Sequence, residues 1–463
     1  MKQLNNIAIL LITVILCSCG EGFLDVKRDA NQVVPATIAD YAAILARDAM
    51  YHTSDDLAFL GADEYFVADY ASLVSGSLYT PFHKNAYVWA DDVYEHQEIR
   101  DWNEAYEKIL YANLALDVQR IEPSPGETNQ WNLVKGSALF HRAWNFYKLA
   151  QLFCPTYDPT TASTDLGVPL RLDYDVSTSY GRPSLAAVYD RILTDLHDAS
   201  GLEWDNGGNI FLPSKAAVHA LLARVYLQMA DYDRALEFAD RVLEERGDLI
   251  DYNQLDTAVS SQYESVFQPH AAGNPAVIFI SKKAVGGIIG PNRFDADTTL
   301  LKAFDANDLR LKVYFFNAPD GKRIFVGSYM GQGLANFFTG FSAEEAMLIK
   351  AECLARQGAV QQAMDVVYNL RLHRYKAGTL QPLTAGTPAE ALQVVLMERR
   401  KELYMRGVRW EDLRRLNREP ELATTLVRHI EGDRYELPPM DNKWVWPIPE
   451  NEVSLNHLVQ NAR

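Results

Sequence analysis

The sequence has few of the residues from which metal and catalytic centres are built. It contains four cysteines and ten histidines, with no CxxC pair and no metal-ligand spacing among the histidines. It also lacks a G-x-S-x-G nucleophile elbow, an H-E-x-x-H zinc motif, a P-loop and a Rossmann fingerprint. The sequence therefore predicts no metal, no cofactor and no catalytic residues.

Positive charge and long apolar runs are also scarce. The formal net charge of −17 argues against binding of nucleic acid and against docking on anionic membranes through basic patches. After residue 16, no apolar run approaches the length of a membrane span. Only Cys154 and Cys353 lie beyond the N-terminal region, both in apolar helical surroundings. We expect buried free thiols there, with a disulfide as the alternative.

The N-terminus has the pattern of a secretion signal. Lys2 precedes an apolar run from Ile7 to Leu16 that is too short to span a bilayer. The run ends in Leu16-Cys17-Ser18-Cys19, which resembles a bacterial lipoprotein box with Cys19 as the lipidated residue. Cys17 suits that role less well, because the bulky Leu16 precedes it. We predict a signal peptide over residues 1–18 and a lipidated tether over 19–36, with an ordinary cleaved signal as the alternative.

Helix pairs dominate the rest of the chain, which we interpret as one domain over residues 37–463. Residues 214–245 predict two helices joined by a turn near Asp231, the first apolar almost all round and the second amphipathic. Leu222, Ala223, Tyr226 and Ala235 have the spacing of a tetratricopeptide-type pair, and Ala351, Leu354 and Ala363 repeat it. Capping boxes are predicted at Ser342/Glu345 and at Thr387/Glu390, the latter starting a helix that extends to Arg406.

Two irregular segments interrupt the helices and divide the domain. An N-terminal helical part (37–250) contains an aromatic-rich excursion over 58–98. A Gly/Pro-rich insertion with short strands follows over 251–340, and a second helical part with an extended tail covers 341–463. Long irregular segments inside a helical protein are usually functional, and these are too apolar for disorder.

The excursion supplies the best candidate binding surface. Sugars present apolar CH faces and hydroxyl edges, so aromatic rings suit the faces while Asp, Asn and Arg suit the edges. For each aromatic ring taken alone, the alternative is packing in the core. The predicted ligand-binding residues are Asp63, Tyr65, Tyr70, Trp89, Asp91, Tyr94, Asn292 and Tyr329. The dense charge run over residues 398–415 alternates acids and bases, so we interpret it as a structural ion-pair network rather than an anion site.

Several segments together resemble the SusD/RagB family of nutrient-binding outer-membrane lipoproteins. The residues that carry the resemblance, in chain order, are Cys19 with Phe23-Leu24-Asp25; Trp102, Tyr106 and Asn113; Gly136-Ser137-Ala138, Arg142 and Tyr147; Lys215-Ala216-Ala217 and Tyr226; Phe304-Asp305 and Asp308-Leu309-Arg310; Ala351-Glu352, Arg356 and Gly358; Glu398-Arg399-Arg400-Lys401-Glu402-Leu403; Gly407 to Arg414; and Trp446-Pro447-Ile448-Pro449 with Gln460-Asn461. The matching segments span nearly the whole chain.

The resemblance implies an all-α fold of tetratricopeptide-like helix pairs, forming a right-handed superhelical scaffold with loop-rich insertions. It also implies non-catalytic binding of an oligosaccharide at the cell surface and its delivery to a SusC-like TonB-dependent transporter. The protein is then expected in the outer membrane, anchored by lipid. A single acid follows Cys19, in Gly20-Glu21-Gly22, where an acidic run would favour surface exposure, so a periplasm-facing anchor is the alternative. Other functional alternatives are a peptide-binding lipoprotein of the same transporter type, a helical glycoside hydrolase and a scaffold with only protein partners.

Overall fold

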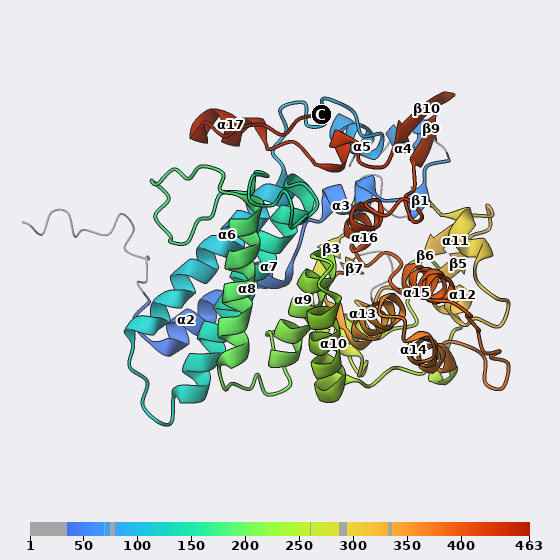
Figure 1. Ribbon diagram of the computed structural model, residues 1–463, viewed down its shortest axis with the longest axis horizontal. Coiled ribbons are helices and arrows are strands. Elements are labelled where there is room, and N and C mark those ends of the chain that lie inside the picture. Colours follow the sequence, from blue (N-terminus) through green and yellow to red (C-terminus); the bar gives the residue numbers. More distant parts are fainter. Residues whose placement is uncertain (1–34, 69, 75–78, 260, 287–293, 332–335) are drawn as a thin grey trace, which may run out of the picture.

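Helices form the body of the protein (Figure 1). The computed structural model describes residues 35–68, 70–74, 79–259, 261–286, 294–331 and 336–463. The helices within these ranges are α2 (Ile38–Leu45), α3 (Asp56–Gly61), α4 (Tyr70–Val74), α5 (Pro81–Tyr87), α6 (Arg100–Ala115), α7 (Thr128–Phe153), α8 (Leu185–Gly201), α9 (Lys215–Gln228), α10 (Tyr232–Arg246), α11 (Thr298–Lys302), α12 (Arg310–Val313), α13 (Ala343–Arg356), α14 (Val360–Leu372), α15 (Pro388–Glu402), α16 (Arg409–Leu416) and α17 (Glu450–Asn456). Short 3₁₀ turns are η2 (Asp48–Tyr51), η3 (Leu116–Arg120), η4 (Tyr252–Gln254), η5 (Pro269–Ala271) and η8 (Asn442–Trp444).

Helices α9 and α10 form the central pair, as predicted. Ser214 caps α9 by accepting from the backbone N–H of Ala217, and α9 is buried along nearly its whole length. Helix α10 buries only its apolar face, on which Phe238 stacks against Tyr226 of α9 with ring centres 5.7 Å apart. The pair thus has an interior helix and a covering helix, which is the arrangement that the hydrophobic pattern indicated.

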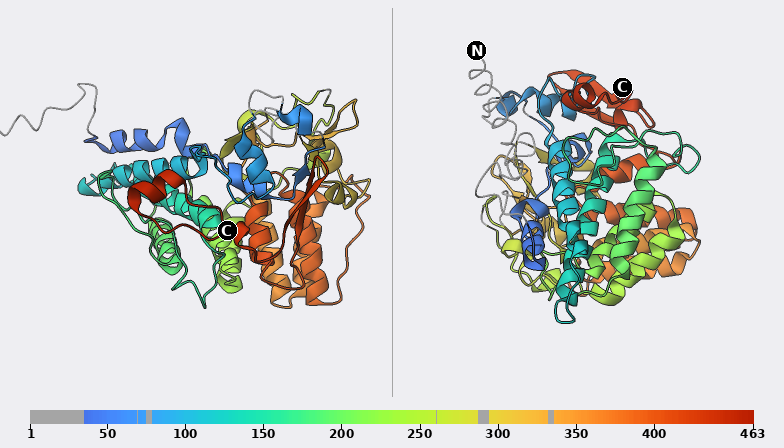
Figure 2. Two further views of the ribbon diagram at one scale, coloured as in Figure 1. Left: turned by 90° about the horizontal axis from the view of Figure 1, so that it is seen from above. Right: turned by 90° about the vertical axis from the view of Figure 1, so that its left-hand side faces the viewer.

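The other helix pairs lie to either side of this one. Helices α6, α7 and α8 pack on one side, and α10 packs against α13, which continues into α14 and α15 (Figure 1; Figure 2). Gly358 makes the turn between α13 and α14 with φ of 81°, a left-handed conformation that favours glycine. The predicted all-α fold of tetratricopeptide-like pairs is confirmed.

The strands of the insertion and of the segments around it form two-stranded antiparallel ribbons rather than a continuous sheet. The paired strands are β1 (Tyr65–Phe66) with β4 (Asp295–Ala296), β2 (Val277–Phe279) with β8 (Phe341–Ser342), β3 (Lys282–Ala284) with β7 (Asn336–Phe338), β5 (Phe315–Asn317) with β6 (Arg323–Phe325), and β9 (Leu426–Ile430) with β10 (Asp433–Leu437). Because β1 belongs to the excursion and β4 to the insertion, this ribbon brings the two irregular segments together.

The charge run at 398–415 is a buried ion-pair network, as predicted. Arg310 is fully buried and donates to Asp308 at 2.7 Å, to Glu398 at 2.5 Å and to Glu402 at 2.8 Å. Arg374 also donates to Glu402. Because Arg310 and Arg374 both pair with Glu402, the network joins α15 to the insertion and to the chain after α14.

Two predictions about helix ends need correction. Ser342 precedes α13 but makes no capping bond, and the carboxylate of Glu345 accepts two hydrogen bonds from the buried Arg224, at 2.7 and 2.6 Å, instead of turning back to Ser342. Helix α15 ends at Glu402 rather than Arg406. The chain then leaves the helix through Met405, which has φ of 56°. The capping box at Thr387 and Glu390 is confirmed.

Cys154 and Cys353 are both buried and unpaired with each other, as expected. Among the helices that the structure describes, none is long and apolar enough to cross a membrane.

Candidate functional site

Four of the predicted ligand contacts belong to the core, among them Tyr65, which is 2% exposed. Trp89, Tyr94 and Tyr329 are at most 3% exposed. Their polar atoms are already bonded inside the protein: Trp89 Nε1 donates to Gly61 O at 3.2 Å, Tyr94 OH to Pro447 O at 2.7 Å and Tyr329 OH to Glu344 Oε1 at 2.5 Å. These rings leave no face for a ligand, so their predicted role is corrected to packing, the alternative that their sequence context left open.

Asp63 and the buried Tyr65 lie in the wall of one pocket. It lies between β1 and β9 and has a volume of about 590 Å³; we call it the β1–β9 pocket. Its lining residues are Asp63, Tyr65, Phe66, Val67, Ala68, Tyr87, Asp297, Thr299, Arg400, Thr424, Thr425, Leu426, Val427, Arg428 and His429. The pocket thus combines residues of the excursion, the insertion and the C-terminal part.

Ion pairs hold Asp63 in the wall of this pocket. It accepts from Arg409 Nε at 2.6 Å and from Arg400 Nη2 at 3.0 Å. Burial alone would raise the pKa of Asp63, but the charges of Arg409 and Arg400 outweigh it and hold that pKa well below its usual range. Asp63 is therefore ionised and committed to the arginines.

Arg428 explains why the aromatic residues of the excursion turn inward. Its guanidinium lies 4.0 Å from the ring centre of Tyr87, 5.4 Å from Tyr65 and 5.3 Å from Trp89. It donates Nη1 to Tyr65 O at 2.6 Å and Nη2 to Ala62 O. The aromatic rings therefore enclose a cation of the protein itself, through cation–π contacts.

The remaining predicted residues are at the surface or outside the described ranges. Tyr70 is half-buried, and its OH lies 2.8 Å from Tyr79 OH, with Lys84 Nζ 4.9 Å from the centre of the Tyr70 ring. Asp91 has an 83% exposed side chain and pairs with Lys443 at 2.7 Å. Asn292 and Cys19 lie outside the described residues.

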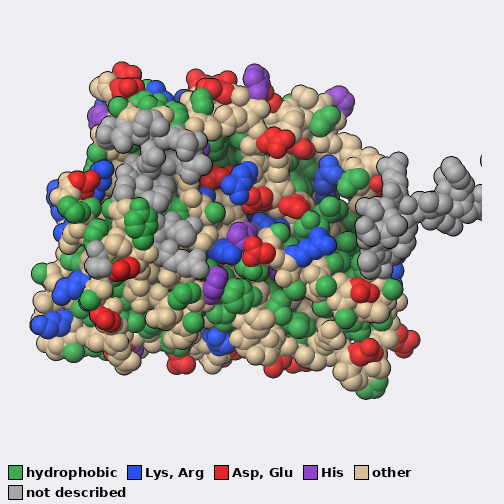
Figure 3. Space-filling model, turned by 180° about the vertical axis from the view of Figure 1, so that it is seen from behind, with side chains coloured by type: hydrophobic (Ala, Val, Ile, Leu, Met, Phe, Trp, Pro, Cys, Tyr) green, Lys and Arg blue, Asp and Glu red, His purple; other side chains and the backbone are tan. Residues whose placement is uncertain are grey.

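A further aromatic surface, which sequence reasoning missed, lies next to β3. Tyr51, His52, Phe211, His270 and Lys282 are all half-buried, and we call this set the histidine face. The ring of Phe211 lies 5.3 Å from that of Tyr51 and 5.8 Å from that of His270, while Lys282 Nζ lies 5.1 Å from the centre of the Tyr51 ring. Strands β3 and β7 lie at the back of Figure 1, and on the opposite view histidine, acidic and basic side chains gather among apolar ones near the middle (Figure 3).

Charged groups surround the rings of the histidine face. The exposed Asp48 lies 2.6 Å from His52 Nε2 and 3.5 Å from Lys282 Nζ. Burial and the neighbouring Lys282 lower the pKa of His52, although Asp48 partly opposes this. Burial and a hydrogen bond to Asp48 raise the pKa of Tyr51 to about 12. At neutral pH, therefore, Tyr51 is a neutral hydroxyl and His52 favours its neutral form.

The backbone at His270 is unusual. His270 and Ala271 have φ of 56° and 55°, in the left-handed region that non-glycine residues rarely adopt. His270 Nδ1 is buried and has no partner among the described residues. Strain of this kind persists where the surrounding structure enforces it, and it concentrates at ligand sites. No pattern in the sequence could have found this face, because its residues come from four separate segments.

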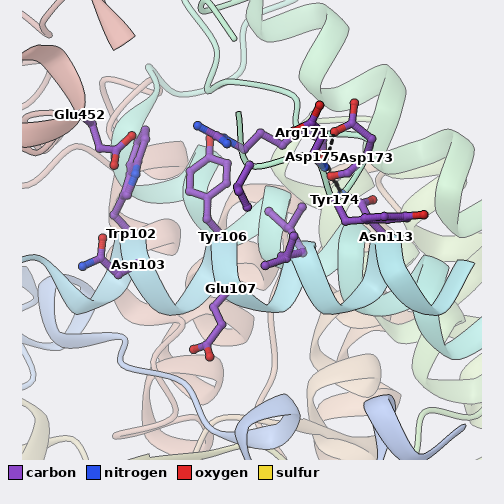
Figure 4. A pocket seen from close by; sticks show the side chains of 13 residues that line it. Trp102, Asn103, Tyr106, Glu107, Asn113, Arg171, Asp173, Tyr174, Asp175 and Glu452 are labelled. Atoms are coloured by element: carbon purple, nitrogen blue, oxygen red, sulfur yellow. Dashed lines mark hydrogen bonds between the residues drawn. The ribbon is translucent and has the colours of Figure 1, made fainter. Parts of the chain in front are cut away.

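A second groove runs along α6 (Figure 4). It has a volume of about 330 Å³ and lies between α6, the loop around residues 171–176 and Glu452 of α17. Trp102 and Tyr106 point into it, whereas Glu107 points away (Figure 4). Its polar groups mostly bond one another: Asn113 Nδ2 donates to Arg171 O at 3.0 Å and to Asp173 O at 2.8 Å. We therefore interpret the α6 groove as part of the scaffold that holds this loop.

No cluster of His, Cys, Asp and Glu able to hold a metal ion occurs in the described ranges.

Comparison with known proteins identifies the family. A family model described as "Starch-binding associating with outer membrane" matches residues 22–227, and the SusD family model matches residues 344–463. Together the two matches cover well over half of the chain. This chain belongs to the SusD family. Members of the SusD family are binding proteins rather than enzymes.

Relatives of this SusD family protein agree with the match. This chain is 25% identical over 380 residues to SusD-like protein P2 of Formosa agariphila. The match covers 68% of this chain and 71% of that protein. Among solved structures, a protein described as sugar-binding from Bacteroides vulgatus has 22% identity and a TM-score of 0.71, over 93% of this chain and 99% of that one. A SusD superfamily protein of Bacteroides thetaiotaomicron has 19% identity and a TM-score of 0.71, over 92% and 100%. These structures establish the shared fold.

Proposed function

We propose that this SusD family protein binds an oligosaccharide at the outer-membrane surface and delivers it to a SusC-like TonB-dependent transporter. The description of the matching family model, starch-binding and associated with the outer membrane, supports the ligand class and the location. The name of the similar Bacteroides vulgatus structure, a sugar-binding protein, supports the same ligand class. We further propose that the protein itself performs no chemistry on the sugar.

The histidine face is the observation that carries the proposal. Tyr51 and Phe211 offer half-exposed rings to the apolar face of a sugar, and they lie in contact with each other. Lys282 and the imidazoles of His52 and His270 supply donors at the edges of these rings, and Asp48 supplies an acceptor. Rings for the sugar face with polar groups for the hydroxyls are the combination that a saccharide requires.

The proposed site is built from segments between helices, not from the helix pairs. Tyr51 follows α2, Phe211 lies between α8 and α9, and His270 and Lys282 belong to the insertion. The helix pairs then serve as the frame. Tyr70 and Asp91, which also remain at the surface, stay proposed as additional contacts.

Binding measurements with a panel of neutral oligosaccharides and peptides test the proposal. Tyr51→Ala should weaken saccharide binding by about 2- to 13-fold, because an aromatic contact contributes about 0.5–1.5 kcal/mol. The matched control is Tyr263→Ala, since Tyr263 is 68% exposed and outside the histidine face. Peptide binding without any saccharide response would contradict the ligand class, and equal binding by Tyr51→Ala and wild type would contradict the site.

Delivery requires a partner in the same membrane. When the tagged full chain is purified from membranes in detergent, a β-barrel protein should co-purify with it, and mass spectrometry should identify that protein as a TonB-dependent transporter. Release of shortened saccharide products during the binding assay would instead support the hydrolase alternative.

A further inference from the structure

The β1–β9 pocket has a surplus of positive charge in a strongly acidic protein. Arg400, Arg409 and Arg428 lie in or directly behind its wall, where Asp63 and Asp297 are the acids that pair with them. The next carboxyl, Glu64, is buried and accepts from Met405 N at 2.6 Å. Burial raises the pKa of Glu64 to about 8, so at neutral pH it is mostly uncharged and does not balance the third arginine.

Of the three arginines at this pocket, Arg428 is the one that has no acidic partner. Its N–H groups donate to the carbonyl oxygens of Tyr65 and Ala62, and its guanidinium lies against aromatic rings. No carboxylate of the described residues lies within 4 Å of it. Carbonyl groups and rings satisfy the hydrogen bonds and partly stabilise the charge, but they carry no net negative charge. Arg428 therefore adds a net positive charge to the wall of the pocket.

Several donors of the pocket wall are free. Arg400 donates Nη2 to Asp63 and Asp297, at 3.0 and 2.8 Å, while its Nη1 donates to no described residue. Its Nε also lacks a partner but is buried. The side chains of Thr425 and His429 line the same pocket and make no hydrogen bond within the described part of the chain. Beside these donors, Phe66 is 37% exposed and offers an apolar surface.

We propose that the β1–β9 pocket binds the negatively charged group of an acidic sugar, a carboxylate or a sulfate ester, with Arg400 as the principal donor. Nη1 of Arg400 can give a charge-assisted hydrogen bond to either group, and the free hydroxyl of Thr425 and imidazole of His429 add further donors. Phe66 packs against the sugar ring. The inference rests on the proposed function, because it assigns an acidic class of saccharide to the same protein, at residues separate from the histidine face.

Titration calorimetry of the full chain in detergent tests the inference with glucuronate and glucose, which differ in one carboxylate. At low salt, glucuronate should bind at least tenfold more tightly than glucose. Arg400→Gln should abolish that preference, and Arg400→Lys should restore it in part, because it keeps the charge but loses the planar fork. The matched control is Arg434→Gln on the neighbouring β10, an exposed arginine outside the pocket.

A second variant separates loss of binding from loss of folding. Thr425→Val touches none of the ion pairs of Asp63, and it should also weaken glucuronate binding while leaving the unfolding midpoint unchanged. Equal affinity for glucuronate and glucose, or a preference that survives in Arg400→Gln, would overturn the inference. Tyr51→Ala should leave the glucuronate preference intact, so failure at the histidine face and failure at the β1–β9 pocket give different results.

Discussion

Replacing Trp89 by alanine distinguishes a core residue from a ligand contact. The indole is 0% exposed, and deletion of a buried Trp side chain costs about 3–5 kcal/mol of folding free energy. Two losses add to the cavity: Gly61 O loses its donor at 3.2 Å, and Arg428 loses one of its three rings. We therefore expect a decrease of about 4 kcal/mol or more in the free energy of unfolding.

The backbone at Trp89 sharpens this prediction. Trp89 has φ of 54°, a left-handed conformation that alanine adopts at a cost of about 1–2 kcal/mol and glycine adopts freely. Trp89→Gly should therefore be at least as stable as Trp89→Ala. Usually the glycine variant is the less stable of the two, because glycine loses more chain entropy on folding. The left-handed conformation at residue 89 reverses that order of stability.

Urea and thermal unfolding followed by circular dichroism measure the effect. Unfolding entropies of about 2.1 cal/mol/K per residue give roughly 1 kcal/mol/K for 463 residues, so 4 kcal/mol lowers the melting temperature by about 4 °C. Tyr263→Ala, at an exposed aromatic residue, should change stability by less than about 0.5 kcal/mol. If Trp89→Ala kept the wild-type midpoint but lost saccharide binding, the assignment of Trp89 to the core would be refuted.

Three further predictions follow from buried charges and from the N-terminus. Burial raises the pKa of Glu64 to about 8, so between pH 4.5 and 8 the folded state holds a proton that the unfolded state has released. The free energy of unfolding should therefore decrease as pH rises through this window, by up to about 1.4 kcal/mol per pH unit. Glu64→Gln should flatten this dependence. Urea midpoints with the same pH profile in wild type and Glu64→Gln would contradict the prediction. Arg310→Ala leaves Asp308, Glu398 and Glu402 without their shared cation and should cost about 3–5 kcal/mol of unfolding free energy, whereas a loss below 1 kcal/mol would show that the network is dispensable. Cys19→Ala should leave the melting temperature unchanged and move the protein from the membrane to the soluble fraction, and a variant that stays in the membrane would disprove lipidation at Cys19.

Local sequence patterns predicted the helix pairs because the hydrophobic pattern of each helix determines which of its faces must be buried. The amphipathic face of residues 232–246 and the apolar surroundings of 215–228 leave no arrangement other than a covering and an interior helix. The capping box at Thr387 could be predicted because its donors and acceptors lie within one helical turn of each other. The box at Ser342 failed because Glu345 meets Arg224, which is 121 residues away, and a buried ion pair outweighs a local cap.

The candidate site was harder to predict, because exposure of an aromatic ring is not a local property. The excursion was identified as aromatic-rich, but Trp89 and Tyr65 turn inward to surround Arg428, a residue more than 330 positions later. Conversely, the histidine face assembles Tyr51, Phe211 and His270 from segments that show no shared signal. Only the close-packed arrangement of the whole chain decides which rings remain at the surface.

By itself, the sequence determined the class of fold, the family resemblance and the structural role of the charge run. These follow from periodicity, from turn and capping residues, and from the order of motifs along the chain. The tertiary structure decided where a ligand can bind, because β1 pairs with β4, and β3 with β7, across more than 50 residues of intervening chain. Those pairings set the histidine face and the β1–β9 pocket, since they determine which side chains face solvent and which charges lack a partner.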